Sequence, residues 1–240
     1  MNNSKKTILI LSPFFRPNIG GVETHLDDLC EYLRRRGHKV FVITYQPLTT
    51  KAKGQKLERK ENLEIRRIRW FGYNWFHKLE PYPIFEWLYL FPGLFVYTFL
   101  FFLKYRNKID VIHAHGLISA LITKILAKVF NKRSVVTIHA VYGFKGGSIF
   151  SKFIKWILSS FDVIFALSIQ SEKELIRIGL KNDKIKVFTH WVDQFVFKPL
   201  NKEECKKKIR WENKFIVLLV GRLIEIKGIY LLIEAAKKLI

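Results

Sequence analysis

Short apolar runs that alternate with helical patterns constrain this chain more than any other feature of its sequence. These runs have the length and β-branched content of strands buried on both faces of a sheet. Most are separated by segments with apolar residues at helical spacing, as in 22–33, where Gly37 then marks a stop. The alternation predicts an α/β fold, a doubly wound, Rossmann-like parallel sheet covered by helices. The predicted strands are residues 7–11, 39–44, 63–70, 110–115, 134–139, 162–168 and 184–188.

Two regions depart from this alternation. Residues 45–62 are polar and lysine-rich, which predicts an exposed loop. Apolar and polar residues alternate over 63–70, which predicts a strand nearer the edge of the sheet. A strand and one helix at the end of the chain cannot bury their own faces, so they predict a second domain that has begun and a truncated sequence. The expected segments there are a crossing over 195–200, a basic helix over 201–210, a buried strand over 215–223 and a helix over 227–240.

The charge balance narrows the class of partner. With 42 Lys and Arg against 20 Asp and Glu, the formal net charge of +22 favours nucleic acid, an acidic membrane surface or phosphorylated ligands. Cys30 and Cys205 lie far apart in the sequence and suggest neither a disulfide framework nor a zinc site. The start of the chain lacks the long apolar region and cleavage site of a signal peptide, so we expect a buried first strand and a cytosolic protein.

Glycine and histidine residues follow the ends of several predicted strands. Gly20 and Gly21 come after the first strand and directly before a helix, whose free N–H groups favour an anion. Such a pair either turns the chain through positive φ or brings bare backbone close to a ligand. His113 and His115 end one strand, and His139 ends the next. Because ligands bind beyond the carboxyl ends of strands in open α/β sheets, these positions predict a site on one rim.

Other kinds of site lack support in the sequence. PNIGG does not match GxGxxG, and no GxxxxGK[ST] or GxSxG stretch occurs, so dinucleotide, P-loop and serine-hydrolase sites are not indicated. His113 and His115 share a face of their strand, but further Asp, Glu or Cys ligands are not evident nearby. We therefore expect no metal.

Four stretches occur in an order that carries a resemblance: FFRPNIGGVETHLDDLCEYLRRRGHKVFVIT, DVIHAHGLISA, VVTIHAVYGF and VGRLIEIKGIYLLIEAA. The chain resembles the family 4 glycosyltransferases, and within them the phosphatidylinositol N-acetylglucosaminyltransferase catalytic subunit and related phosphatidylinositol glycosyltransferases. The resemblance implies the GT-B fold, in which two Rossmann-like domains face a cleft. It implies an acceptor-side domain over residues 1–190, an interdomain linker over 191–213 and the start of a truncated donor-binding domain over 214–240.

The resemblance also implies roles for residues at matching positions. Gly20 and Gly21 would place backbone N–H groups against the donor diphosphate or the reacting sugar, where a side chain would collide. His139 matches the histidine that contacts the donor sugar and helps to hold the transition state. Arg222 and Lys227 match the basic pair that grips the diphosphate, whose negative charge grows as the glycosidic bond breaks. Arg offers a bidentate fork and Lys a point charge.

The family's chemistry implies a retaining transfer from a nucleotide-sugar co-substrate, with no metal and no further cofactor. His25, His113 and His115 are candidate acceptor-side residues. HWVD at 190–193 stands where an NGVD-like turn is usual, which indicates a changed hinge or cleft wall, and the family's E-x7-E motif would lie beyond Ile240. We therefore expect this 240-residue chain alone to be inactive. The alternative is a non-catalytic membrane- or partner-binding module of the same fold.

An aromatic stretch over residues 70–105 bears on the acceptor. Its centre, 87–103, has no charged residue, and Pro92 and Gly93 interrupt it. Three interpretations remain open: a helix buried on the sheet, an interfacial element that dips into the bilayer, and a transmembrane span. Basic clusters on both sides suit an anionic leaflet, and aromatics gathered in one apolar block disfavour nucleic acid. We expect a cytoplasmic protein, peripheral at the inner face of the membrane, that binds no nucleic acid and takes a lipid or lipid-linked acceptor.

Overall fold

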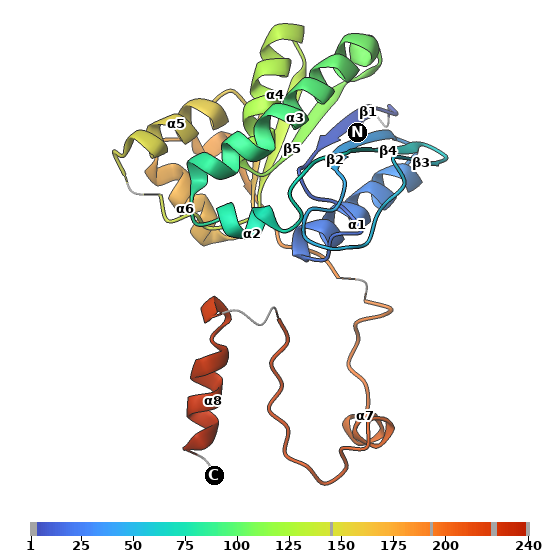
Figure 1. Cartoon of the computed structure of the whole chain (residues 1–240), viewed down its shortest axis with the longest axis vertical. Helices are drawn as coiled ribbons and strands as arrows, with labels where there is room; N and C mark the ends of the chain where they lie inside the picture. Colours follow the sequence, from blue (N-terminus) through green and yellow to red (C-terminus); the bar gives the residue numbers. More distant parts are fainter. Residues whose placement is uncertain (1–3, 145, 193, 222–224, 239–240) are drawn as a thin grey trace. The chain divides into compact units, whose positions relative to one another are not determined.

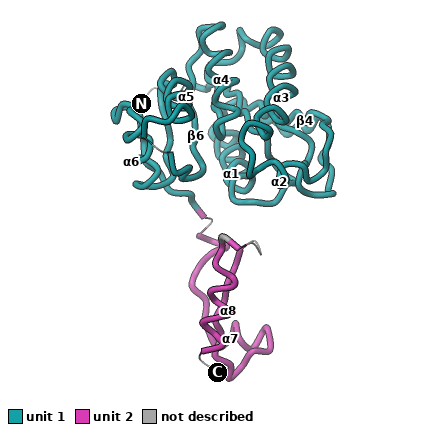
Figure 2. Tube along the Cα trace, turned by 60° about the vertical axis from the view of Figure 1, so that its left-hand side comes forward, with its two compact units in different colours: residues 1–191 teal, residues 192–240 magenta. Residues whose placement is uncertain are grey.

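The computed structural model describes residues 4–144, 146–192, 194–221 and 225–238. The chain divides into two compact units, Met1–Trp191 and Val192–Ile240, coloured separately in Figure 2. The larger unit is built on one sheet in the order β3-β4-β2-β1-β5-β6-β7-β8, in which all neighbours are parallel except β3 and β4. The strands are β1 (Thr7–Leu11), β2 (Lys39–Tyr45), β3 (Leu57–Lys60), β4 (Leu63–Ile68), β5 (Val111–His115), β6 (Arg133–Ile138), β7 (Val163–Ala166) and β8 (Ile185–Val187).

Helices cover both faces of this sheet, as the alternation predicted (Figure 1). α1 lies on one face, where Leu26 belongs to the same core cluster as Ile10. α3 and α4 lie on the other face, where Leu90 and Ile122 share a cluster with Leu9. Neighbouring residues of β1 point to opposite faces, so one strand serves both layers. The helices are α1 (Gly21–Arg35), α2 (Trp75–Leu79), α3 (Pro83–Tyr105), α4 (Leu117–Phe130), α5 (Ile149–Leu158) and α6 (Ile169–Arg177), with short turns η1 (Arg106–Lys108) and η2 (Asn182–Lys184).

Local sequence sets several helix ends. Ser148 and Ser168 precede α5 and α6, and each hydroxyl accepts a hydrogen bond from a backbone N–H three residues later. Pro83 begins α3 at a position where a missing N–H costs nothing. Gly37 follows α1 with a φ of 80°, the left-handed conformation that ends many helices. The stop predicted at Gly37 is confirmed.

All the strands predicted for the larger unit are present, with ends that shift by one or two residues. β6 ends at Ile138, so His139 follows the strand rather than ending it. The prediction of an exposed loop over 45–62 was wrong in part, because β3 forms there, antiparallel to β4 at the edge of the sheet. An edge strand has one neighbour and carries charged residues, as LERK does, so no apolar pattern marked it in the sequence.

The smaller unit contains α7 (Lys202–Lys208), the turn η3 (Glu225–Lys227) and α8 (Ile229–Lys237). Both helices were predicted. The strand predicted over 215–223 is not formed in its described part, 215–221, where Phe215 is 94% exposed. A strand needs a neighbour to pair its backbone groups, and the described residues of this unit contain no other strand. The apolar run therefore stays without regular structure.

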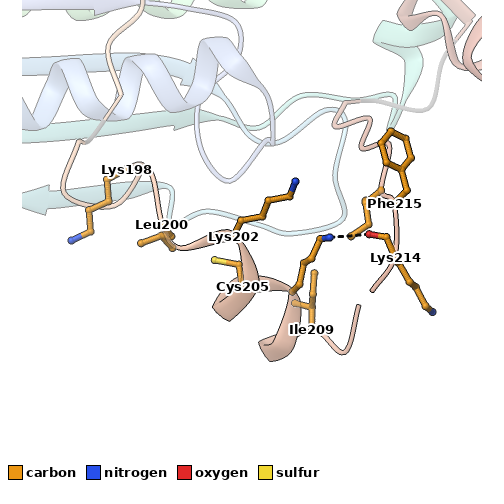
Figure 3. Close-up of a pocket in the computed structure, with 9 residues that line it drawn as sticks. Lys198, Leu200, Lys202, Cys205, Ile209, Lys214 and Phe215 are labelled. Atoms are coloured by element: carbon orange, nitrogen blue, oxygen red, sulfur yellow. Dashed lines mark hydrogen bonds between the residues drawn. The ribbon is translucent and has the colours of Figure 1, made fainter. Parts of the chain in front are cut away.

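A hollow of about 470 Å³ lies within the smaller unit. Lys206 Nζ donates a hydrogen bond to the carbonyl oxygen of Lys214 at 2.9 Å across it (Figure 3). Ligand sites usually combine an apolar cavity with a few convergent polar groups. Here the described walls are lysine stems and exposed chain, so the hollow gives no indication of function. Its lining residues are Lys198, Leu200, Lys202, Cys205, Lys206, Ile209, Lys214, Phe215 and Ile216.

Candidate functional site

The direction of strand addition reverses at β1, which has β2 on one side and β5 on the other. In open α/β sheets such a reversal opens a crevice beyond the carboxyl ends of the strands, and ligands bind there. The loop after β1, the N-terminus of α1 and the ends of β5 and β6 all lie at this rim. The glycine pair and the predicted strand-end histidines therefore belong to one rim.

Histidine side chains from β5 and from the end of β6 meet at this rim. His115 Nδ1 and His139 Nε2 lie 2.9 Å apart, and His113 Nε2 lies 2.8 Å from Thr137 Oγ1. His113 is in register with Ile10, whose side chain packs under α1. Residues two apart share a face of a strand, so these side chains project to the side of the sheet that α1 covers.

His25 and His190 complete a histidine cluster, defined here as His25, His113, His115, His139 and His190. The His25 ring of α1 lies 4.4 Å from His190, 5.6 Å from His139 and 6.0 Å from His115, measured between centroids. His190 stacks on His139 at 5.9 Å with an interplanar angle of 11°. Five of the chain's seven histidines thus gather at one place. His190, which the sequence marked only as a departure from the family pattern, is one of them.

Burial without a countercharge lowers the pKa of every ring in the histidine cluster. Desolvation lowers the pKa of His25 to about 4 and the pKa values of His113 and His139 to about 3, and neighbouring histidines add to each shift. Desolvation also holds the pKa of His115 well below 6.5, and lowers that of the exposed His190. The rings are therefore neutral at physiological pH, and each has one N–H donor and one acceptor nitrogen.

Three buried ring nitrogens of the cluster have no hydrogen-bond partner among the described residues. They are His25 Nδ1, His115 Nε2 and His139 Nδ1. A buried polar atom without a partner costs about 1–3 kcal/mol. Such atoms mark places where a ligand or a water molecule completes the hydrogen bonding.

The glycine pair lies at the N-terminus of α1 without a left-handed turn. Gly20 is extended, with φ 174° and ψ 173°, and neither glycine is among those with φ in the left-handed region. The turn hypothesis for this pair was therefore wrong. A Cβ on Gly21 would meet nothing within 4 Å, while one on Gly20 would lie 2.4 Å from the flexible carboxylate of Glu23. The protein leaves the space beside Gly21 open, as contact with a ligand requires.

A buried arginine that the sequence analysis did not single out fixes the loop before α1. Arg67 of β4 is 2% exposed, and its guanidinium donates hydrogen bonds to the carbonyl oxygens of Arg16 and Gln55. It also donates to Glu58 Oε2 at 3.0 Å. The signal was present in the sequence, because the alternation over β4 places Arg67 on the buried face.

The basic pair expected at the diphosphate stays a prediction. Arg222 lies outside the described residues. Lys227 ends η3 in the smaller unit and is exposed. The structure describes each unit by itself, so it does not bring Lys227 to the histidine cluster.

The described residues also contain no group of three or more His, Cys, Asp or Glu side chains arranged to hold a metal ion. The histidine cluster itself lacks the geometry, although it is rich in nitrogen ligands. The site as described consists of neutral rings and backbone N–H groups.

The profile of Glycosyltransferase Family 4 matches residues 19–194. That range covers most of the chain and includes every member of the histidine cluster. The chain belongs to glycosyltransferase family 4. The family resemblance inferred from the sequence is thereby confirmed.

Relatives of this family 4 chain include subunits of phosphatidylinositol N-acetylglucosaminyltransferase. Its GPI3 subunit from Saccharomyces cerevisiae (strain YJM789) is 27% identical over 237 residues, 96% of this chain and 49% of its own length. The matching subunit of the Arabidopsis thaliana enzyme is 29% identical over 239 residues, 96% of this chain and 48% of its own. The matching subunit of the Homo sapiens enzyme is 27% identical over 238 residues, which are 94% of this chain and 43% of its own length. The chain spans about half the length of these relatives.

Solved structures agree on the fold of this family 4 chain. A sucrose-phosphate synthase from Thermosynechococcus elongatus aligns with a TM-score of 0.76 at 19% identity, over 98% of this chain and 60% of that one. Anabaena Alr3699/HepE, solved in complex with UDP-glucose, aligns with a TM-score of 0.67 at 17% identity, over 97% of this chain and 57% of that one. At such identities the likeness concerns the fold alone. It confirms the predicted α/β, GT-B type architecture with a Rossmann-like domain.

Proposed function

We propose that this chain is the acceptor-side part of a retaining glycosyltransferase that moves a sugar from a nucleotide-sugar donor to a lipid or lipid-linked acceptor at a membrane surface. One observation carries the proposal: a neutral histidine cluster with buried, unpartnered ring nitrogens lies at the strand ends, beside the open N-terminus of α1. Neutral imidazoles hydrogen-bond to hydroxyl groups, and a helix N-terminus favours a phosphate. This combination suits a sugar joined to a diphosphate.

His139 has the central role in this proposal. Its Nδ1 is buried without a partner among the described residues, which leaves it free for the donor sugar. Positive charge develops on the sugar ring as a glycosidic bond breaks. Because burial lowers the pKa of His139 to about 3, the ring stays neutral and does not oppose that charge. It holds the sugar by a hydrogen bond instead.

The diphosphate gains negative charge in the same step, and donors fixed in advance stabilise it. We assign this role to the backbone N–H groups at Gly20 and Gly21, where the dipole of α1 favours an anion. Arg222 and Lys227 would add fixed positive charge. Because these groups supply the charge that a metal ion would otherwise provide, the proposed transfer needs no metal and no cofactor besides the nucleotide-sugar.

The outward face of α3 supports an acceptor in a membrane. α3 packs on the sheet through one face, as the first of the three sequence interpretations required. Among the described helices it is the one long and apolar enough to cross a membrane. Leaving the sheet would uncover its core residues, so we propose that it lies along the interface, with its outer side toward the lipid. The buried residues are Tyr89, Leu90, Leu94, Thr98, Phe101 and Phe102; the exposed ones include Ile84, Phe85, Leu88, Val96, Leu100 and Leu103.

The apolar surface continues onto α5, and we call the whole the α3–α5 face. Trp87 of α3 meets Phe153 of α5 with ring centroids 5.7 Å apart, and Trp156 beyond it is 53% exposed. Lys124 Nζ lies 3.9 Å from the centroid of the Trp156 ring. Aromatic rings beside lysines suit the boundary of an anionic leaflet. These contacts support our proposal that the protein lies at the cytoplasmic leaflet, where anionic lipids are found.

Vesicle binding tests the α3–α5 face. Trp156→Glu adds a negative charge and removes an anchor, so we expect affinity for vesicles containing phosphatidylinositol to fall about tenfold, since each basic or aromatic anchor contributes roughly 1 kcal/mol or more. Tyr32→Glu is the matched control, because Tyr32 is equally exposed, at 52%, on α1 across the sheet. Co-sedimentation with anionic and neutral vesicles measures both. Equal losses in the two variants would mean that binding depends on net charge alone.

The names of relatives indicate which substrates to try first. Three relatives are subunits of phosphatidylinositol N-acetylglucosaminyltransferase, and HepE was solved with UDP-glucose. We therefore propose UDP-N-acetylglucosamine and UDP-glucose as the first donors and phosphatidylinositol as the first acceptor.

The proposed function is tested by measuring donor-dependent sugar transfer with the protein isolated from its native host. His139→Ala is expected to lower transfer at least about 100-fold, the range found when one catalytic hydrogen-bonding group is removed. His38→Asn is the control, because His38 precedes β2 at the opposite end of the strands and accepts a hydrogen bond from the Lys6 N–H. The 240-residue chain assayed alone is expected to be inactive. Vesicle binding without transfer from any nucleotide donor would favour the non-catalytic module instead.

A further inference from the structure

The geometry of the histidine cluster points to His115 as a positioning residue that holds His139 in one tautomer, with the ring N–H of His139 at Nδ1. In that tautomer His139 offers the site a hydrogen-bond donor suited to an oxygen lone pair of a sugar or phosphate. The catalytic meaning of this inference rests on the proposed function of His139. Its structural content does not.

The hydrogen bond between the two rings couples their tautomers. His115 Nδ1 and His139 Nε2 lie 2.9 Å apart, and the ring centroids are 5.2 Å apart with an interplanar angle of 23°. Both rings are neutral, so one of these nitrogens donates and the other accepts. If His115 Nδ1 donates, the single N–H of His139 must be at Nδ1. If His139 Nε2 donates, the N–H of His115 must be at Nε2.

Burial decides between the two directions. Either direction leaves one N–H and one lone pair unpartnered, at His115 Nε2 and His139 Nδ1. Orphaned buried N–H groups are rarer in proteins than under-satisfied acceptors, so the N–H belongs where a partner can reach it. Both nitrogens are buried, but His115 lies within β5 and is 2% exposed, whereas His139 follows the end of β6 and is only partly buried, so a ligand at the rim reaches His139 first. We therefore assign the donor to His115 Nδ1, which leaves the free N–H on His139.

The surroundings of His115 keep its ring in place. His113 lies 4.2 Å away between centroids and is itself bonded to Thr137, and His25 of α1 lies 6.0 Å away. His113 and His115 belong to β5, a central strand that is paired on both sides. A donor fixed in this way needs no reorganisation when a substrate oxygen arrives, which is the condition under which a hydrogen bond contributes most to catalysis.

Nitrogen NMR of the 240-residue chain tests the assignment without any assay of activity. The chain is labelled with ¹⁵N-histidine, and two-bond proton–nitrogen correlations at neutral pH distinguish protonated from unprotonated ring nitrogens. The signals of His139 are identified by their loss in His139→Gln. We expect a protonated Nδ1 and an unprotonated Nε2 for His139, and a protonated Nδ1 for His115.

Three variants separate positioning from a merely structural role. His115→Leu removes the donor, so the two nitrogen shifts of His139 are expected to move toward each other as its tautomers exchange. His115→Asn keeps an N–H near the Nδ1 position and is expected to preserve the wild-type pattern. His38→Asn is the control, because His38 precedes β2 at the opposite end of the strands and accepts a hydrogen bond from the Lys6 N–H. It is expected to leave the His139 pattern unchanged.

Two results would overturn the inference. One is a wild-type His139 with averaged shifts or a protonated Nε2, which needs His139→Gln for the assignment but no folded His115 variant. The other is a folded His115→Leu variant whose His139 pattern is unchanged. Sugar transfer by the protein as its host makes it is a separate readout: His115→Leu is expected to lower kcat about tenfold and His115→Asn to restore most of it. If His139→Ala transfers sugar normally, the proposed function of His139 fails, while the tautomer result still stands.

Discussion

Arg67 and the histidine cluster both place buried polar atoms near the carboxyl ends of parallel strands, but only those of Arg67 all have partners. Each guanidinium nitrogen of Arg67 has an acceptor, supplied by two backbone carbonyls and the carboxylate of Glu58. The histidine cluster has three buried nitrogens without a partner among the described residues and contains no carboxylate. Burial lowers the pKa values of its rings, so they are neutral and need no countercharge.

Under the proposed function, the difference separates a structural from a functional use of buried polar groups. A paired charge is satisfied by the fold and has nothing left to offer a ligand, so Arg67 serves to anchor the loop before α1. Unpaired neutral rings cost stability and keep their hydrogen-bonding capacity for a substrate. Protonation of the histidine cluster, removal of Arg67 and the addition of a methyl group beside Arg67 should therefore have distinct effects on stability and on sugar transfer.

The largest expected effect is a loss of stability in mild acid. The folded-state pKa values of His25, His113 and His139 are lowered to about 4, 3 and 3, whereas unfolded histidine titrates near 6.5. Below about pH 6.5 the unfolded chain binds more protons, so the free energy of unfolding falls as the pH drops toward 4. Each histidine contributes up to about 1.4 kcal/mol per pH unit. Urea unfolding from about pH 7.5 to about pH 4.5 measures this slope.

Glu86 titrates in the same range with the opposite sign and provides the control. Burial, with a smaller contribution from Glu80, raises the pKa of Glu86 to about 7. The folded state therefore binds more protons than the unfolded state between about pH 4.5 and 7, and this stability is lost as the pH rises through 7. Glu86→Gln removes the compensation, so its loss of stability in acid is expected to be steeper than that of the wild type. A flat profile in Glu86→Gln would contradict a buried neutral histidine cluster.

Removal of the paired arginine should cost stability at every pH. Arg67→Leu leaves two backbone carbonyls without a donor and Glu58 without one of its partners, so we expect the free energy of unfolding to fall by about 3 kcal/mol. Arg59→Leu is the control, because Arg59 is 65% exposed in its ion pair with Glu64 and is expected to cost less than about 1 kcal/mol. Denaturant unfolding compares them. Similar losses would show that burial of Arg67 adds nothing to its pairing.

The smallest effects are expected at two glycines, Gly54 beside Arg67 and Gly21 at the start of α1 near the histidine cluster. A Cβ on Gly54 would lie 2.5 Å from Arg67 Nε, so Gly54→Ala is expected to cost about 1–2 kcal/mol by overpacking. A Cβ on Gly21 meets open space at the start of α1, so Gly21→Ala is expected to leave stability unchanged or raise it by up to about 1 kcal/mol. The same variant should weaken sugar transfer if Gly21 contacts the donor. Normal transfer by Gly21→Ala would remove that glycine from the proposed site.

An element of this fold could be predicted from the sequence only where its signal lies in its own residues. Strands buried on both faces are marked by their own apolar residues, so β1, β2 and β5 were found. β3 was missed, because a charged edge strand exists only through its pairing with β4. The opposite error occurred at 215–221, where an apolar run has no neighbouring strand in the described part of its unit.

The candidate site was predicted in the same partial way. The positions of Gly20, His113, His115 and His139 after strands placed them at one rim, because parallel strands end at the same edge. His25 was named with His113 and His115 as an acceptor-side candidate, whereas nothing in the sequence linked His190 to them. Arg67 was also within reach of the alternation in β4, although an arginine on a buried face gives no sign of its partners.

By itself the sequence determined the elements, the rim at which the histidines and glycines lie, and the family, since periodicity and motifs are properties of neighbouring residues. Only the tertiary structure decided the hydrogen bond between His115 and His139, 24 residues apart, and the bonds of Arg67 to a carbonyl 51 residues away. It also decided which side of α3 is covered. Charge state and hydrogen-bond capacity depend on desolvation and on partners distant along the chain, and both arise only when the sheet and its helices are assembled.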